Sequence, residues 1–364
     1  MKNKIITFSF AAVIFGLFIL NLFKPAQEIS LSERRRLAQM PQISSESLTD
    51  GKFTENFEKY ASDQFVWREN FRSIKAYTDR ILFRKLDTNG LFQIGDNIFK
   101  IEYPLNESKV SELCTKLNNV YDMYLSGMNV CFSVIPDKNC YVPENSPYLV
   151  MDYRRIEEIM QENLSRMKYI SIFDSLSLDS YYNTDGHWRQ EKLKAVTESL
   201  CEGIGVSFIL DPDSYELKTY EPFYGAYYGQ SARRLRPDRI VWMVNEGTEN
   251  AEVRSLSYPD RTDLKVYFEE GLGGIDSYDL FLYGAQPLIV LKNKNGSSAR
   301  SLIIFRDSYS SSLAPLLLGC YDEIILIDLR YISPELIGEY VDFSDQDVLF
   351  LLSTTIINNS DIIR

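Results

Sequence analysis

The chain has 364 residues, of which 45% are hydrophobic and 13% aromatic, so it is long enough to bury a core and lacks the composition of a disordered protein. Its formal net charge of −12 argues against a protein that binds nucleic acid through a basic surface. An acidic surface suits work at an anionic cell envelope, and solubility alone explains it equally well.

The amino terminus predicts a membrane anchor over residues 1–24. Residues 5 to 23 contain no charged side chain, which is long enough for a helix to span a bilayer, and Lys2 and Lys4 precede them. A signal peptide has the same layout, but the run ends in bulky residues and Pro25, with no small-x-small cleavage site. We therefore expect an uncleaved anchor with the following chain outside the cell membrane. Cleavage, which would release a secreted protein, is the alternative.

Residues 25–88 predict a polar, mostly helical juxtamembrane segment. A first helical stretch opens at Leu31 and ends at Met40, because the following Pro41 lacks a donor and restricts the residue before it. Between residues 53 and 84 apolar side chains recur with a spacing near 3.6, which predicts amphipathic helices. Asp63 and Arg68 are expected to form an ion pair that shapes a corner between helices.

Residues 89–364 alternate between strand and helix patterns, which predicts an α/β domain with a mainly parallel sheet. A buried strand over residues 129–135 ends at Pro136-Asp137-Lys138, and we expect Lys138 to be a solvated surface lysine rather than a ligand of an anionic group. The tyrosine-rich stretch 220–239 predicts either a glycan-binding platform or an ordinary β-hairpin.

The five cysteines share no short CxxC spacing and predict neither a zinc site nor a disulfide framework. Most lie beside apolar residues and are expected to be buried thiols. A bridge between Cys131 and Cys140 stays open.

The segment Thr184-Asp185-Gly186-His187-Trp188 holds the only histidine of the chain. Any neutral-pH proton transfer of the usual kind must therefore use His187. An aspartate two residues before a histidine on a turn can hold the imidazole Nδ1 and leave Nε2 free, so Asp185 is the expected orienting residue. A simple loop-to-helix cap explains the segment equally well on its own.

A nucleophile is expected at Ser308. Residues 301–305 predict a buried strand, and a helix is expected to start at about residue 310, so Ser308 lies on a sharp strand-to-helix turn with backbone amides available to an oxyanion. Helix capping by Asp307 or Ser308 is the alternative.

The two segments together resemble the DHHW family of Gram-positive bacteria, which is related to the alginate O-acetyltransferases of the AlgJ and AlgX type with an SGNH-hydrolase-like domain. The resemblance implies a three-layer α/β sandwich. Two positions depart from the pattern: Gly186 replaces the first histidine of the family, and Arg306 replaces the glycine of Gly-Asp-Ser.

The resemblance implies a serine O-acetyltransferase that acts on an extracellular polysaccharide, receives its acetyl group through a membrane-bound partner of the MBOAT type and needs no metal or soluble cofactor. Ser308, His187 and Asp185 would be catalytic. Candidate oxyanion or substrate contacts are Tyr309, Gln286, Gly225, Arg306 and Trp188. An SGNH-type esterase and a non-catalytic polysaccharide-binding scaffold are the alternatives.

Overall fold

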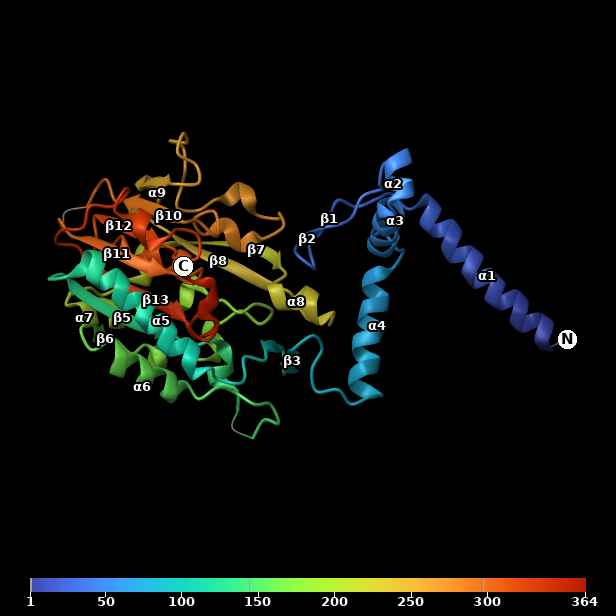
Figure 1. The fold of residues 1–364 in the computed structure, drawn as a ribbon, viewed down its shortest axis with the longest axis horizontal. Helices are drawn as coiled ribbons and strands as arrows, with labels where there is room; N and C mark the ends of the chain where they lie inside the picture. Colours follow the sequence, from blue (N-terminus) through green and yellow to red (C-terminus); the bar gives the residue numbers. More distant parts are fainter. Residues whose placement is uncertain (1, 144, 297) are drawn as a thin grey trace.

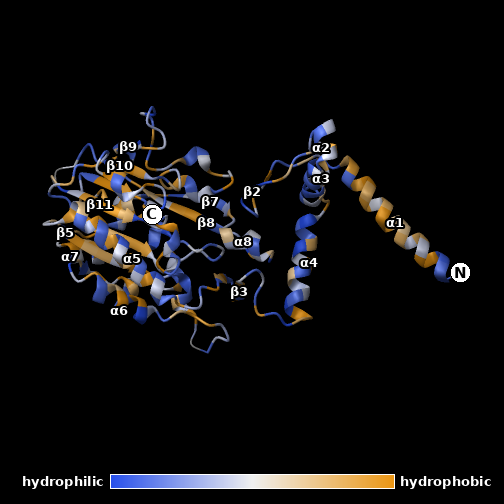
Figure 2. Cartoon of the chain, viewed as in Figure 1, coloured by the Kyte–Doolittle hydropathy of each residue, from blue (hydrophilic) through white to orange (hydrophobic). Residues whose placement is uncertain are grey.

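The amino-terminal apolar run forms one long helix, α1 (Lys2–Phe23), that extends away from the α/β domain. The computed structural model describes residues 2–143, 145–296 and 298–364. Figure 1 shows α1 on one side of a group of short elements and the α/β domain on the other. Helix α1 is apolar along most of its length (Figure 2), and none of its side chains is buried.

Residues 25–88, called the stalk below, are only partly helical. It contains the short strands β1 (Ile29–Ser30) and β2 (Arg35–Arg36), followed by helices α2 (Ser45–Thr49), α3 (Lys52–Asp63) and α4 (Arg68–Ile81). The helix predicted from Leu31 is therefore wrong. Strands β1 and β2 pair antiparallel around a turn in which Arg34 has a φ of 54°, a left-handed value that a helix cannot contain.

Ion pairs hold the stalk together, and the expected pair of Asp63 and Arg68 is one of them, beside closer pairs that were not expected. Asp63 lies 2.6 Å and 2.8 Å from the two terminal nitrogens of Arg35, and it is 3.9 Å from Arg68. Arg68 also pairs with Glu33, at the shorter distance of 2.5 Å. The hairpin thus bonds to both ends of the corner between α3 and α4, which the predicted helix would not have allowed.

The α/β domain is built on a seven-stranded sheet in the order β6-β5-β13-β11-β12-β10-β9. Five adjacent strands, β6 to β12 in that order, are parallel, and β10 and β9 add antiparallel pairs at one edge. Their bounds are β5 (Asn129–Ile135), β6 (Lys168–Tyr169), β9 (Glu252–Ser255), β10 (Leu288–Lys292), β11 (Ser301–Arg306), β12 (Glu323–Ile327) and β13 (Asp347–Ser353).

Helices cover both faces of this sheet because alternate strand residues point to opposite cores. Leu302 and Ile304 belong to one core with helices α7 (Lys194–Ile204) and α10 (Ser310–Leu317). Ile303 and Phe305 belong to the other core, with α5 (Glu107–Val120) and α6 (Tyr153–Asn163). The central strands are the most apolar part of the domain (Figure 2).

Smaller elements complete the domain. They are the hairpin β3 (Leu91–Ile94) and β4 (Asn97–Lys100), a second hairpin β7 (Glu216–Phe223) and β8 (Asp238–Val244) with helix α8 (Ala226–Ser231) between its strands, and helices α9 (Glu246–Asn250), α11 (Pro334–Ile337) and α12 (Thr354–Ile357). The five cysteines of the described chain are free thiols, four of them buried, so Cys131 and Cys140 are not bridged.

Candidate active site

Ser308 lies just past the carboxyl end of β11, on the turn that leads into α10. The Asp307 carboxylate fixes this turn by accepting hydrogen bonds from the backbone amides of Tyr309 (3.1 Å) and Ser353 (2.7 Å). The second bond ties the turn to the end of the neighbouring strand β13. Ser308 stays partly exposed while the residues on either side of it are buried. A short, well-held turn therefore presents one hydroxyl at the sheet edge.

His187 is brought to Ser308 from a loop more than a hundred residues earlier. Its Nε2 lies 2.8 Å from Ser308 Oγ, and its Nδ1 lies 2.6 Å from Asp185 Oδ1. Because an ionised carboxylate only accepts hydrogen bonds, Nδ1 carries the proton and Nε2 accepts the one from the serine. The three side chains form a continuous hydrogen-bonded array in the order that nucleophilic catalysis requires.

The Asp185 carboxylate is almost completely buried, and every oxygen has a donor. Oδ1 also accepts the backbone amide of His187 at 3.0 Å, whereas Oδ2 accepts the amide of Ala226 at 2.7 Å and Nη1 of Arg34 at 2.9 Å. Burial alone would raise the pKa of Asp185, but the neighbouring charges of His187 and Arg34 and these hydrogen bonds outweigh it and hold the pKa well below its usual range. The residue is therefore ionised at neutral pH.

Arg34 is the residue of this array that sequence reasoning missed. It lies on the turn between β1 and β2, and its guanidinium also pairs with Asp276. The run of three arginines at residues 34–36 was the available signal, but in the sequence it shows only a basic stretch. Its contact with Asp185 joins residues 151 apart, a spacing that no local pattern encodes.

Two tyrosines hold the His187 ring in place. Tyr278 stacks on it with ring centroids 4.1 Å apart and planes at 18°, and Tyr309 packs against it at 4.9 Å. The Tyr278 hydroxyl hydrogen-bonds Ser312 at 3.1 Å, which fixes the stacking ring to α10. The imidazole therefore has one orientation available, with its edge toward Ser308.

The prediction of a solvated Lys138 is wrong. Its side chain is only 2% exposed, and Nζ donates to the carbonyl oxygens of Tyr182 (2.7 Å), Asn183 (3.1 Å) and Asp185 (3.3 Å). Burial lowers the pKa of Lys138 to about 7, against the opposing charges of Asp238 and Asp185. Lys138 therefore stabilises the loop that carries His187 by donating to its backbone carbonyls rather than to an anionic ligand.

Trp188 and Gly225, expected as substrate contacts, are both buried. Trp188 Nε1 donates to the Tyr309 carbonyl (3.0 Å) and to Ser312 (2.9 Å), so it joins the histidine loop to α10. Gly225 allows two backbones to approach, because a Cβ there would lie 2.2 Å from the Thr184 carbonyl oxygen. That approach is what brings the Ala226 amide to Asp185.

Gln286 and Arg306 are buried and bond to residues other than Asp185, His187 and Ser308. Both ends of the Gln286 amide are used, since Oε1 accepts from Ser255 (2.7 Å) and Nε2 donates to the Tyr283 carbonyl (3.2 Å), so the structure does not bring it to the array. Arg306 is buried and donates to Ser311 at 2.6 Å.

The Tyr309 amide is taken by Asp307, and its hydroxyl donates to the Gly186 carbonyl at 2.7 Å. Within the described residues the amide of Ser308 itself has no acceptor. The turn therefore leaves this amide free to donate a hydrogen bond.

Gly186, where the resembling family has a histidine, lies against the side chain of Tyr227. A Cβ at this position would lie 2.6 Å from the Tyr227 hydroxyl oxygen and 3.1 Å from Cζ. Tyr227 begins the first turn of α8, and its amide donates to the Thr184 carbonyl at 3.0 Å. The tyrosine ring therefore takes the room that a second imidazole would need.

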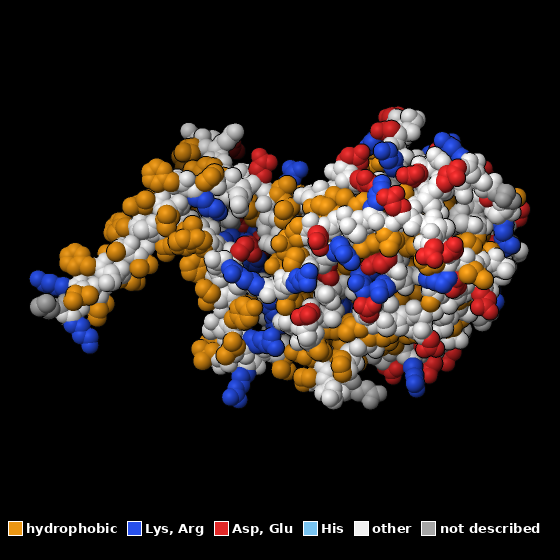
Figure 3. Space-filling view, turned by 180° about the vertical axis from the view of Figure 1, so that it is seen from behind, with side chains coloured by type: hydrophobic (Ala, Val, Ile, Leu, Met, Phe, Trp, Pro, Cys, Tyr) orange, Lys and Arg blue, Asp and Glu red, His pale blue; other side chains and the backbone are white. Residues whose placement is uncertain are grey.

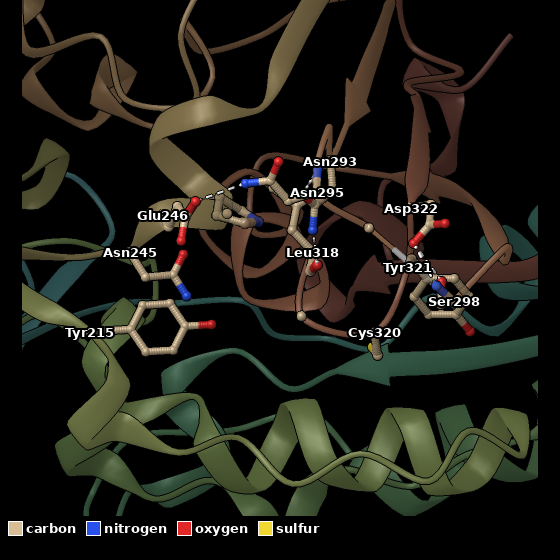
Figure 4. Close-up of a pocket in the computed structure, with 14 residues that line it drawn as sticks. Tyr215, Asn245, Glu246, Asn293, Asn295, Ser298, Leu318, Cys320, Tyr321 and Asp322 are labelled. Carbon is tan, nitrogen blue, oxygen red and sulfur yellow. Dashed lines mark hydrogen bonds between the residues drawn. The ribbon is translucent and has the colours of Figure 1, made fainter.

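A pocket of about 330 Å³ lies away from this array. Figure 4 shows its polar lining, which includes Asn245, Asn293 and Asp322. Asn293 follows β10 and Asp322 precedes β12, so the pocket opens at the sheet edge opposite the one that carries Ser308. Across residues 2–143, 145–296 and 298–364, no group of histidine, cysteine or acidic side chains gathers in a way that could hold a metal ion.

Comparison with known proteins shows the fold. No family model matches the chain, and no curated protein matches it significantly. Among solved structures, a DHHW family protein from Eubacterium siraeum superposes with a TM-score of 0.64 at 21% identity, covering 76% of this chain and 94% of its own. PatB1 of Bacillus cereus with a sulfonyl adduct superposes with a TM-score of 0.58 at 14% identity, covering 75% and 96%.

The O-acetyltransferase domain of AlgJ from Pseudomonas putida has a TM-score of 0.47 at 12% identity, covering 74% of this chain and 92% of its own. The expected three-layer α/β fold and its relation to structures of the DHHW type are confirmed. The likeness in fold to the DHHW family structure covers 76% of this chain.

Proposed function

We propose that this protein is a serine O-acetyltransferase that modifies a polysaccharide of the cell envelope from the outer side of the membrane. The observation that supports this proposal is the hydrogen-bonded array of Asp185, His187 and Ser308. That the transferred group is acetyl and the acceptor a polysaccharide is proposed from the motif resemblance to the DHHW proteins and their AlgJ and AlgX relatives. Helix α1, which is long and apolar enough to cross a membrane, supports the location.

The first half of the reaction forms an acetyl-enzyme. Ser308 Oγ attacks the carbonyl carbon of the acetyl donor while His187 Nε2 takes the hydroxyl proton. The tetrahedral oxyanion accepts a hydrogen bond from the Ser308 amide. When the carbon–oxygen bond to the leaving group breaks, His187 returns the proton to that group, and the acetyl group stays on Ser308.

The second half reverses these roles with a sugar hydroxyl. His187 removes the proton of the hydroxyl, the sugar oxygen attacks the acetyl carbon, and the bond to Ser308 breaks as the serine recovers its proton. Water in place of the sugar would release acetate, which is the esterase reaction. The partner that delivers acetyl groups across the membrane is, by the sequence resemblance, an MBOAT-type membrane acyltransferase.

The nucleophile can be tested directly with an aryl sulfonyl fluoride. Ser308 Oγ attacks sulfur, fluoride leaves, and the serine proton passes to His187, so the full-length protein in detergent should gain one sulfonyl group by intact mass. Ser308→Ala should gain none and should lose roughly 10⁴-fold or more in hydrolysis of a chromogenic acetyl ester. Ser310→Ala is the matched control, because Ser310 is fully buried two residues away.

Labelling of Ser308→Ala at the rate of the unchanged protein would reject Ser308 as the nucleophile. Adding an oligosaccharide as acceptor distinguishes acetyl transfer from ester hydrolysis. Acetylated oligosaccharide formed at the expense of free acetate supports transfer, whereas release of acetate alone, unaffected by added oligosaccharide, supports the esterase.

A further inference from the structure

Helix α4 presents an apolar stripe to solvent on the side away from the α/β domain. The stripe begins at Trp67, which caps the helix, and continues with Phe71, Ile74 and Ile81. The successive intervals of four, three and seven residues place these side chains on one face of a helix. Their side chains are between 46% and 74% exposed. Leu82 and Phe83 extend the same exposed patch past the end of the helix. Together these six residues are called the α4 stripe.

The opposite side of α4 is already occupied. Ser73 and Ala76 are buried, and Arg72 donates to the carbonyl of Gly229 on α8 at 2.6 Å. Helix α4 therefore has one face against the domain and one apolar face free, rather than being a loosely attached helix. An exposed apolar area of this extent on a soluble surface marks a contact with something else.

The charges around the α4 stripe point to what that contact is. Residues 68–85 contain six basic and two acidic side chains. Basic side chains outnumber acidic ones only in the amino-terminal part of the chain. Residues 1–88 hold 14 basic and 10 acidic side chains, whereas residues 89–364 hold 25 basic and 41 acidic side chains. A basic helix with an apolar face has the composition of helices that lie in the interface of anionic membranes.

The position of the stripe relative to α1 agrees with this composition. The last turn of α1 is bonded to the stalk, since Asn21 Oδ1 accepts the amide of Val66 at 2.8 Å and Lys24 donates to the Gln64 carbonyl at 3.0 Å. Helix α4 starts two residues after Val66. Figure 1 shows α4 between α1 and the α/β domain, and Figure 3 shows hydrophobic side chains gathered on α1 and on the edge of the stalk that faces it.

An apolar cavity between α1 and α3 fits the same picture. It has a volume of about 610 Å³, and its lining includes Leu17, Phe18, Phe57 and Phe65. A cavity of that lining is unfavourable for water, whereas the acyl chains at the edge of a bilayer would fill it.

We propose that the α4 stripe lies in the surface of the membrane, in contact with anionic phospholipid, and that the stalk thereby holds the candidate active site close to the bilayer. Because Arg34 of the same stalk reaches Asp185, the face of the domain that carries the site turns toward the membrane. An acetyl group handed over by a membrane protein would then travel only a short distance. This inference rests on the proposed anchoring by α1.

Trp67 makes the test direct, because the other two tryptophans, Trp188 and Trp242, are buried. The full-length protein is reconstituted in vesicles of phosphatidylglycerol and phosphatidylcholine, with lipids brominated on the upper part of the acyl chain as fluorescence quenchers. The emission of Trp67 is the difference between the emission of the original protein and that of Trp67→Phe. We expect the bromolipids to quench most of it.

Two variants in the Trp67→Phe background locate the contact. Ile74→Trp on the stripe should be quenched as strongly as Trp67, whereas Ile209→Trp, at a position 79% exposed on the α/β domain, should not be quenched. Unquenched emission from both stripe positions would overturn the proposal and leave the stripe to a protein partner. Equal quenching at Ile209 would also overturn it, because the whole domain would then contact lipid.

Two further measurements keep this result separate from the proposed function. Retention of the protein in the vesicles after an alkaline carbonate wash reports on the anchor alone. Hydrolysis of the chromogenic acetyl ester in detergent reports on the active site alone. Loss of quenching with both of these intact counts against the membrane contact of α4 and leaves the proposed enzyme standing.

Discussion

Replacing Arg34 by glutamine tests whether the stalk takes part in the candidate active site. Arg34 supplies one of the two donors to Asp185 Oδ2, at 2.9 Å, and the Ala226 amide supplies the other at 2.7 Å. Arg34→Gln removes the charge and the contact while leaving the turn between β1 and β2 in place. The carboxylate would keep its bonds to His187, but one of its oxygens would lose a charged partner inside a buried site.

The size of the effect follows from the burial of Asp185. A hydrogen bond to a charged group contributes about 1.5–3 kcal/mol, and each 1.36 kcal/mol corresponds to a tenfold change in rate. If the full amount serves to hold Asp185 in position against His187, we expect kcat to fall by about ten- to a hundredfold. KM should change little, because Arg34 lies behind Asp185 and not at the nucleophile.

The assay is hydrolysis of the chromogenic acetyl ester by the full-length protein in detergent, with kcat and KM measured separately. Arg36→Gln is the matched control, because Arg36 is exposed and forms no ion pair among the described residues. Arg34→Lys keeps the charge without the planar fork and should give an intermediate rate. A kcat for Arg34→Gln within twofold of the original, or an equal loss in Arg36→Gln, would refute the reasoning.

Two further predictions concern the departure from the family motif and the acid stability of the stalk. Gly186→His should lower the free energy of unfolding by about 1–3 kcal/mol in chemical denaturation, because its Cβ would meet Tyr227. Adding Tyr227→Ala should recover part of this loss. A free energy of unfolding for Gly186→His equal to that of the original protein would contradict the prediction. The hydrogen bond from Arg35 lowers the pKa of Asp63 to about 2, below its ordinary value of 3.8, so the pair stabilises the fold above pH 3.8 and this contribution is lost as the pH falls through about 2. The fluorescence of the exposed stalk tryptophan should therefore change over this interval in the original protein and much less in Asp63→Asn, and identical acid titrations would count against the pair.

Much of the α/β domain could be predicted from the sequence, because its signals are local. The strand at residues 129–135 was expected with the bounds that the structure has, and strand β11 was expected one residue short of its observed end. Buried strands are short apolar runs between turn residues, and the pattern does not depend on their neighbours. The first stalk helix failed for the opposite reason: the hairpin there depends on distant ion pairs of Glu33 and Arg35, which outweigh a weak local helix preference.

The sequence by itself determined which residues could do the chemistry. A single histidine, an aspartate two positions before it and a serine on a strand-to-helix turn left few other assignments, since the chemistry of each side chain is a property of the residue. Which groups surround them was decided only by the tertiary structure. Arg34, Lys138 and Tyr278 reach the histidine loop from three distant segments, and Trp188 turns inward although it adjoins His187. Contacts between distant segments arise from packing the whole chain, so no local pattern records them.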